Sequence, residues 1–235
     1  MAKLITIVGN SGVGKTTLTQ LLCSQGPFVT GLEQIVERPF QARFAQDLRR
    51  YALPNQVDYL LLRAEQEWAI RQQPQTGIQD GGLEVDYHLF TRRFHQRGYL
   101  SDDEYGLCAR LYAFARLALP PPDLIIRLVA PLDVIAARYA ARNRPLEIAQ
   151  LDDLADMERL LDDWLGQVTQ TPILTVDASR DDPTYAQAQG PLLAAIGAAV
   201  EPQHLPSLSR GSGRDCAIID EINYGCTQIN LEELP

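Results

Sequence analysis

The chain has 235 residues, of which 46% are hydrophobic, and it carries a formal net charge of −9 at pH 7 with a pI near 4.8. This length is enough for one sizeable α/β domain, or for one domain with a tail. The acidic balance argues against a general affinity for nucleic acid or for an anionic membrane. The sequence contains no signal-peptide pattern and no apolar run long enough to span a bilayer. We therefore expect a cytoplasmic protein whose four cysteines, which match no zinc-binding pattern, stay reduced.

The first predicted element is a strand over residues 4–8, a run of branched apolar residues typical of strands buried on both faces. The segment Gly9–Thr16 then matches the pattern G-x-x-x-x-G-K-[ST], and a helix follows. Strand, glycine-rich loop and helix in this order form a P-loop, whose backbone N–H groups and helix N-terminus bind phosphates. Lys15 is placed to neutralise the outer phosphates, and the Thr16 hydroxyl is placed to bind Mg²⁺. The residues expected to bind ATP here are Gly9, Asn10, Gly12, Val13, Gly14, Lys15, Thr16 and Thr17.

The rest of the chain alternates between short apolar runs and helical patterns. Strands are predicted at residues 28–32, 77–80, 124–129 and 173–176, and helices at 41–50, 54–73, 85–97, 101–119, 131–141, 151–169 and 182–200. Pro54 is expected to begin the helix over residues 54–73, and Ser101, in a capping box with Glu104, is expected to begin the helix over residues 101–119. Strands separated by helices indicate a five-stranded parallel sheet with helices on both faces, the three-layer α/β/α fold of P-loop kinases.

The composition changes near residue 200. The segment after it is rich in proline, serine and glycine and has the composition of a linker. We predict a kinase-like domain at residues 1–200 and a C-terminal extension at 201–235, whose last part is either a packed strand or an ordered tail.

Two groups of polar residues have spacings that suit a binding site. Gln56 and Arg63 are seven residues apart in a predicted helix, which places them on one face two turns apart, and Asp86 follows the next strand. A set of guanidinium groups occupies one helix and the turn after it: Arg138, Arg142 and Arg144. Such a cluster suits a lid that closes over a triphosphate, with a solvated basic helix end as the alternative.

The order and spacing of these motifs resemble the deoxyribonucleoside kinase family, which includes the deoxycytidine, deoxyguanosine and deoxyadenosine kinases. The likeness runs from residue 1 to about residue 180. The P-loop is common to many families, whereas the set of Gln56, Arg63 and Asp86 and the arginine-rich lid are more specific. The resemblance implies transfer of a phosphoryl group from ATP, with Mg²⁺, to the 5′-hydroxyl of a deoxyribonucleoside that carries a purine or cytosine base. It also implies a homodimer formed through a helix bundle.

The resemblance assigns roles to individual residues. Glu33 matches the glutamate that acts as general base and lies near Mg²⁺, although Glu37 is a competing carboxylate. Glu147 matches a lid carboxylate that contacts the sugar 3′-hydroxyl. The base-reading residues are Gln56, Arg63 and Asp86, and the catalytic residues are Glu33, Lys15 and Arg142.

The sequence departs from the family pattern at two places. Asp80-Gly81-Gly82 stands where the family has Asp or Glu followed by Arg-Ser, so an arginine that would reach the phosphates is missing. Its replacement could come from any of three arginines nearby in the sequence: Arg38, Arg92 and Arg93. Ala45 stands where many members have a tyrosine on the 3′-hydroxyl, and neighbouring Phe44 cannot make that bond. These departures leave two alternatives open, a nucleotide-binding protein with little or no turnover and a kinase of another small molecule.

Overall fold

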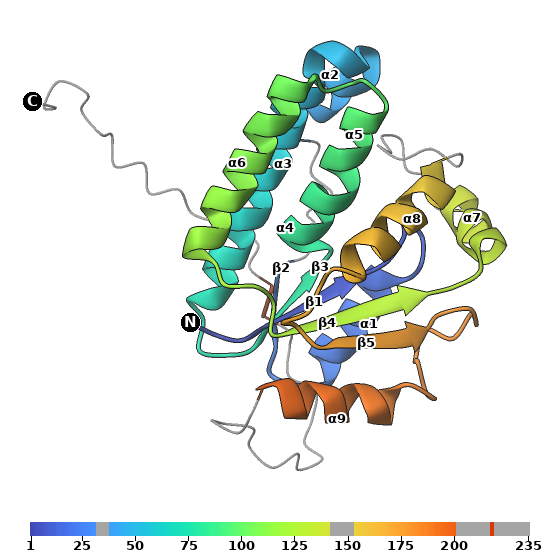
Figure 1. The fold of residues 1–235 in the computed structure, drawn as a ribbon. Coiled ribbons are helices and arrows are strands. Elements are labelled where there is room, and N and C mark those ends of the chain that lie inside the picture. Colours follow the sequence, from blue (N-terminus) through green and yellow to red (C-terminus); the bar gives the residue numbers. More distant parts are fainter. Residues whose placement is uncertain (32–37, 142–152, 201–216, 219–235) are drawn as a thin grey trace, which may run out of the picture.

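A parallel β-sheet forms the centre of the computed structural model, which describes residues 1–31, 38–141, 153–200 and 217–218 (Figure 1). The strands are β1 (Leu4–Val8), β2 (Val29–Gly31), β3 (Gly77–Asp80), β4 (Leu124–Val129), β5 (Ile173–Asp177) and β6 (Ala217–Ile218). Their order in the sheet is β5-β4-β1-β3-β2-β6, and every neighbouring pair is parallel. The predicted five-stranded parallel sheet is confirmed. The two residues of β6, from the predicted extension, add a sixth strand beside β2.

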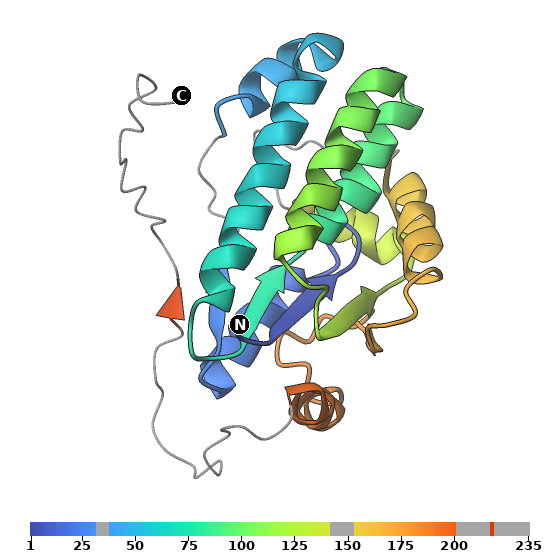
Figure 2. The same ribbon diagram turned by 60° about the vertical axis from the view of Figure 1, so that its left-hand side comes forward.

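Helices cover both faces of the sheet (Figure 1 and Figure 2). One layer contains α1 (Lys15–Gln25) and α9 (Gln189–Val200); the other contains α3 (Leu48–Arg71), α4 (Gly82–Val85), the π-helix η1 (Asp86–Thr91), α5 (Arg92–Gln96), α6 (Asp102–Ala118) and α8 (Leu154–Leu165). Helix α2 (Gln41–Gln46) precedes α3, and α7 (Leu132–Ala141) follows β4. Side chains alternate along each strand, so Ile126 packs into the core with α1 and α9 while Ile125 packs into the core with α8.

Several helix boundaries differ from the prediction. Pro54 lies inside α3 and does not begin it, because Asp47 caps the helix earlier by accepting a hydrogen bond from the Arg50 N–H at 3.1 Å. The helix predicted over residues 85–97 is divided into α4, η1 and α5. Helix α9 begins at Gln189 because Asp182 instead accepts from the Thr184 and Ala186 N–H groups in a turn. The capping box of Ser101 and Glu104 is confirmed.

A buried ion-pair network joins α3, α4 and α6. Arg116 contacts Glu67 at 2.8 Å and Glu84 at 2.9 Å, and Glu84 also accepts a hydrogen bond from the Tyr112 hydroxyl at 2.5 Å. Burial by itself would raise the pKa of Glu84. Hydrogen bonds from His88 and Tyr112 and the charge of Arg116 outweigh it, and the pKa is lowered. The network therefore holds this carboxylate in its charged form between the helices.

No helix among the described residues is long and apolar enough to cross a membrane.

Candidate active site

The glycine-rich loop between β1 and α1 has a backbone that only glycine adopts freely. Gly9 has φ of +152° and Gly14 has φ of +114°, and a Cβ on Gly9 would lie 2.8 Å from the Leu128 carbonyl oxygen. Lys15 folds back over this loop, and its Nζ donates to the Gly9 and Asn10 carbonyls at 3.1 and 3.0 Å. The loop therefore has the strand–loop–helix geometry in which backbone N–H groups and a lysine can surround phosphates.

The second residue of the loop is fixed by its side chain to α8. The Asn10 Nδ2 donates to the Leu154 carbonyl at 2.8 Å and to Glu158 Oε2 at 3.0 Å, and Asn10 Oδ1 accepts from the Ser11 N–H. Glu158 in turn accepts from Arg127 on β4 at 3.0 Å. The side chain of Asn10 is fully buried, so the contribution to phosphate binding that the sequence predicts for Asn10 falls to its backbone.

Asp80 is a site residue to which the sequence analysis gave no role. It ends β3, next to β1 in the sheet, and its Oδ2 accepts a hydrogen bond from the Thr16 hydroxyl at 2.7 Å. A hydroxyl and a carboxylate beside a phosphate-binding loop are the oxygen ligands that Mg²⁺ takes together with phosphates and water. These two residues fit a magnesium site, although the described residues hold no cluster of three or more His, Cys, Asp or Glu suited to a metal.

The predicted base-reading residues converge. Arg63 on α3 and Asp86 at the start of η1 form a buried ion pair, with Arg63 Nε 2.7 Å from Asp86 Oδ2. The Gln56 Nε2 donates to the Asp86 backbone carbonyl at 2.9 Å. All three side chains are buried. A glutamine amide nitrogen has two N–H donors, so the hydrogen bond to the Asp86 carbonyl uses only one of the donors of Gln56.

Asp86 is the first residue of the π-helix η1. The Thr91 hydroxyl donates to the Asp86 carbonyl at 2.9 Å, the same oxygen that Gln56 contacts. Single π-helical turns occur often at functional sites because they redirect one or two side chains within a helix. Here the irregular turn lies at the residue that faces Arg63. The apolar periodicity of the sequence carried no sign of it.

Gly81 and Gly82, which stand where the family has Arg-Ser, have a backbone conformation that glycine adopts readily. Gly81 has φ of +77° and ψ of −75°, and Gly82 has φ of +76°. A Cβ on Gly82 would lie 2.6 Å from Gln79 Oε1. Neither arginine nor serine fits these positions without strain.

Three arginines are the candidates to replace the missing family arginine, and two of them form ion pairs with carboxylates. Both Nε and Nη2 of Arg38 donate to Asp58, at 2.8 and 2.6 Å. Arg93 is buried and forms an ion pair with Asp153, the residue before α8. The Arg92 guanidinium opposes, through its charge, the rise that burial causes in the pKa of Tyr87. The structure selects none of them as the substitute.

We predict that Gly81→Arg lowers the stability of the protein. A non-glycine residue at this φ costs about 1 to 2 kcal/mol, so the melting temperature should fall by several degrees. Gly81→Ala is the matched control, because it adds the same backbone strain without a guanidinium. Thermal unfolding of both variants measures the strain. A Gly81→Arg variant as stable as the wild type would contradict this backbone.

Several predicted residues cannot be placed or are held away from the loop. Glu33, Glu37, Arg142, Arg144 and Glu147 lie outside the described residues. Arg138 on α7 donates to the Ala178 and Arg180 carbonyls at 2.7 and 2.8 Å, so it would reach a triphosphate only by exchanging these partners. Ala45 is exposed, and Phe44 is buried against Phe94 with ring centroids 4.8 Å apart.

Known proteins match this chain over most of its length. The family model for deoxynucleoside kinase matches residues 5–200. A deoxyadenosine/deoxycytidine kinase of Bacillus subtilis (strain 168) is 26% identical over 174 residues, which cover 73% of this chain and 80% of that protein. A deoxyguanosine kinase of the same organism is 24% identical over 189 residues, which cover 77% and 89%.

A solved structure, that of the deoxyadenosine kinase from M. mycoides, has the same fold. It aligns with a TM-score of 0.72 at 21% sequence identity, and the match covers 82% of this chain and 100% of that one. The fold, the P-loop and the match of the family model over most of the sequence agree. The chain belongs to the deoxynucleoside kinase family and is a phosphotransferase that acts on an alcohol group.

Proposed function

We propose that this protein uses ATP to phosphorylate the 5′-hydroxyl of a deoxyribonucleoside that carries a purine or cytosine base. The observation that carries the proposal is the buried ion pair of Arg63 and Asp86, with Gln56 on the Asp86 carbonyl. Ion pairs buried in a protein are costly to desolvate and need a reason to be retained. Hydrogen bonding to the polar edge of a nucleobase would be such a reason. The cytoplasmic location stays a prediction.

The phosphoryl donor would lie at the P-loop. Lys15 and the N-terminus of α1 supply positive charge where the transferred phosphate becomes more negative in the transition state. Thr16 and Asp80 would hold Mg²⁺, which when bound neutralises phosphate charge. The hydrogen bond between their side chains, 2.7 Å long, already holds these oxygens together.

The acceptor would lie between α3 and η1. Asp86 lies six residues after Asp80 in the sequence. The short helix α4 therefore connects the proposed magnesium ligand at the end of β3 with the proposed base-reading carboxylate. A carboxylate accepts hydrogen bonds, so Asp86 would favour a base with an exocyclic amino group. The similar Bacillus subtilis proteins bear the names deoxyadenosine/deoxycytidine kinase and deoxyguanosine kinase, which fits this preference.

Glu33 is the proposed general base. A hydroxyl attacks phosphorus faster as its proton leaves. Strand β2 ends at Gly31, two residues before Glu33 in the sequence, at the same edge of the parallel sheet as the P-loop after β1 and Asp80 at the end of β3. We expect Glu33→Gln to lower nucleoside-dependent ADP release by about 10²-fold or more. Glu37→Gln is the matched control and should retain most of the activity. The opposite pattern would assign the base to Glu37.

A nucleotide-binding protein with little turnover is the second candidate function. The geometry of Gly81 and Gly82 favours it, because an arginine that stabilises phosphoryl transfer can contribute on the order of 10³-fold. The two functions differ in a single assay. A weak enzyme releases ADP only when nucleoside is present, whereas a binding protein is stabilised by ATP and nucleoside without releasing ADP.

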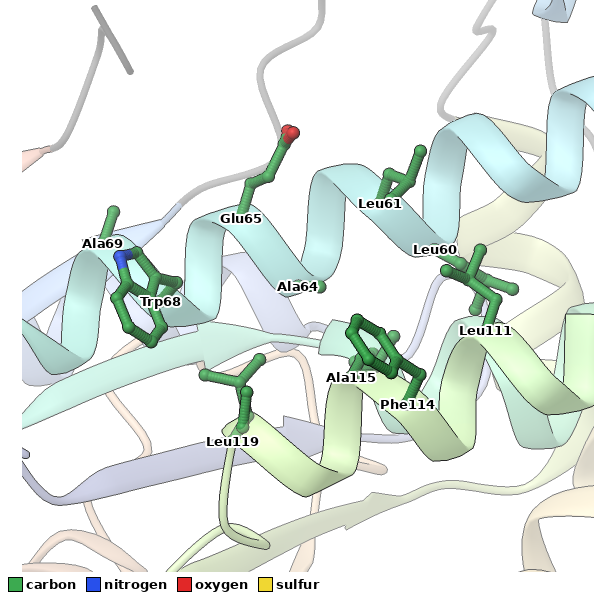
Figure 3. Close-up of a pocket in the computed structure, with 12 residues that line it drawn as sticks. Leu60, Leu61, Ala64, Glu65, Trp68, Ala69, Leu111, Phe114, Ala115 and Leu119 are labelled. Carbon is green, nitrogen blue, oxygen red and sulfur yellow. The ribbon is translucent and has the colours of Figure 1, made fainter. Parts of the chain in front are cut away.

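We further propose that the protein forms a homodimer through α3 and α6. An apolar groove of about 340 Å³ lies between these helices (Figure 3). Trp68 is 49% exposed and Phe114 is 71% exposed on its rim. A large exposed apolar patch is uncommon on a monomer and marks an interaction surface. Two copies could bury these side chains against each other as a four-helix arrangement.

An interface at this groove predicts that the protein is a dimer in solution. The wild type should have twice the mass of its 26.2 kDa chain, and Phe114→Glu, which puts a charge into the apolar surface, should give the monomer. Leu132→Glu is the matched control, since Leu132 is exposed on α7 outside the groove. Sedimentation or light scattering gives the masses. A monomeric wild type, or a Phe114→Glu variant that is still a dimer, would exclude this interface.

A further inference from the structure

Asn55 on α3 has a buried amide with no partner. Its side chain is fully buried, and neither Nδ2 nor Oδ1 forms a hydrogen bond. Leaving a buried donor or acceptor unpaired costs about 1 to 3 kcal/mol. Among the described residues, Asn55 is the one with two unpaired polar side-chain atoms, a donor and an acceptor. The other buried polar atoms without a hydrogen bond are the Thr30 hydroxyl and the Nε atoms of three arginines, Arg93, Arg116 and Arg127, each of which forms an ion pair with a carboxylate.

The sequence around Asn55 gives it no structural advantage either. Asparagine has low helix propensity, and here it lies in a helix interior directly after a proline. Leucine or alanine at this position would stabilise α3 and remove the unpaired amide. Where helix propensity, burial and hydrogen bonding all disfavour a residue, a function at that site is the expected reason.

Asn55 precedes Gln56, one of the proposed base-reading residues, on α3. Residues of an α-helix are about 100° apart, so Asn55 is about 80° around the helix from Arg63 and about 120° from Leu61 in the outer groove. It lies within about 20° of Gln66, whose Oε1 accepts from Arg63 at 3.2 Å. Its sequence neighbour is Gln56, which contacts Asp86. The lining of the apolar groove does not include Asn55, so the nearest functional group on α3 is the amide of Gln56, the next residue in the chain.

We propose that Asn55 is a further substrate-binding residue, whose amide forms hydrogen bonds with the bound nucleoside. Its chemistry fits a group that both donates and accepts, which means a sugar hydroxyl or the polar edge of the base. Sugar contacts are otherwise few among the described residues, since Ala45 is exposed and Phe44 is packed against Phe94. This inference rests on the proposed function, because it concerns the same nucleoside site.

Asn55→Leu separates a binding role from a structural one. Leucine has the same branching and number of side-chain heavy atoms as asparagine and no unpaired polar atoms, so the ligand-free variant should unfold at the same temperature as the wild type or higher. Its KM for the deoxyribonucleoside should rise about tenfold, the loss expected for a hydrogen bond of about 1.4 kcal/mol, while its KM for ATP stays within about twofold. Thr30→Val is the matched control. The Thr30 hydroxyl is also buried and unpaired, but Thr30 points to the opposite face of the sheet from Gly31, which faces α3.

Substrate analogues identify the group that Asn55 contacts. A nucleoside that lacks the contacted group, either the 3′-hydroxyl or the exocyclic substituent of the base, should bind the wild type about tenfold more weakly, and Asn55→Leu should not distinguish it from the parent nucleoside. An unchanged nucleoside KM in Asn55→Leu, or a variant clearly less stable than the wild type, would overturn this assignment alone. A wild type that binds no nucleoside in calorimetry would overturn the proposed function as well.

Discussion

Replacing Lys15 by alanine is expected to lower kcat/KM by about 10²- to 10³-fold, because it removes one oriented positive donor from the phosphoryl-transfer site. The same variant should lose most of the thermal stabilisation by ATP, which for the wild type is about 2.7 kcal/mol at a ligand concentration of 100 times Kd. The ligand-free variant should unfold like the wild type. In the structure the Lys15 ammonium group donates to the Gly9 and Asn10 carbonyls, and water can replace it there.

Lys3 gives the control for this experiment. It is the other lysine of the chain, half exposed and paired with Asp123 at 2.8 Å. Exposed ion pairs contribute at most about 1 kcal/mol, so Lys3→Ala should retain both turnover and stabilisation by ATP. Unchanged stabilisation by ATP in Lys15→Ala would mean that nucleotide binds elsewhere than at the P-loop.

The second large effect is expected at the Arg63–Asp86 pair. Asp86→Ala leaves a buried guanidinium without its carboxylate and should cost about 3 to 5 kcal/mol of unfolding free energy, with loss of nucleoside binding. The double variant Arg63→Met with Asp86→Leu replaces the whole pair by apolar side chains. It should recover most of the stability, because a well-packed apolar pair can match a buried ion pair. It should not recover nucleoside binding.

This double variant distinguishes a pair retained for reading the base from one retained for stability. Denaturant unfolding gives the free energies, and calorimetry gives the affinity for nucleoside. Arg159→Ala is the control, since Arg159 forms an exposed pair with Asp156 on α8 and should cost less than about 1 kcal/mol. A double variant that is stable and still binds deoxyribonucleoside with wild-type affinity would remove these two residues from the site.

The sequence predicted those parts of the fold that depend on local pattern. Continuous branched apolar runs identified β1 and β4 with their observed bounds, and the capping residues located the start of α6. Pro54 misled the prediction, because its preference for the first turn of a helix is weaker than the cap that Asp47 provides. Proline in a long helix is tolerated when packing holds the helix on both sides of it.

The parts of the site that escaped prediction depend on contacts between distant segments. The bond between Thr16 and Asp80 joins residues 64 positions apart and exists only because β1 and β3 are neighbours in the sheet. The unpaired amide of Asn55 is visible only once burial is known. The positive φ of Gly81, which strains any side chain placed there, is likewise visible only in the backbone and not in the sequence.

The most direct test of the account is kcat/KM for ADP release across a panel of phosphate acceptors, measured for the wild type. We predict the highest values for deoxyadenosine, deoxyguanosine or deoxycytidine, whose bases offer an amino group to Asp86, and values at least tenfold lower for thymidine and for alcohols that are not nucleosides. Equal values for thymidine and the amino-bearing nucleosides, or a preference for an acceptor without a base, would contradict a nucleoside site built on Asp86 and Arg63.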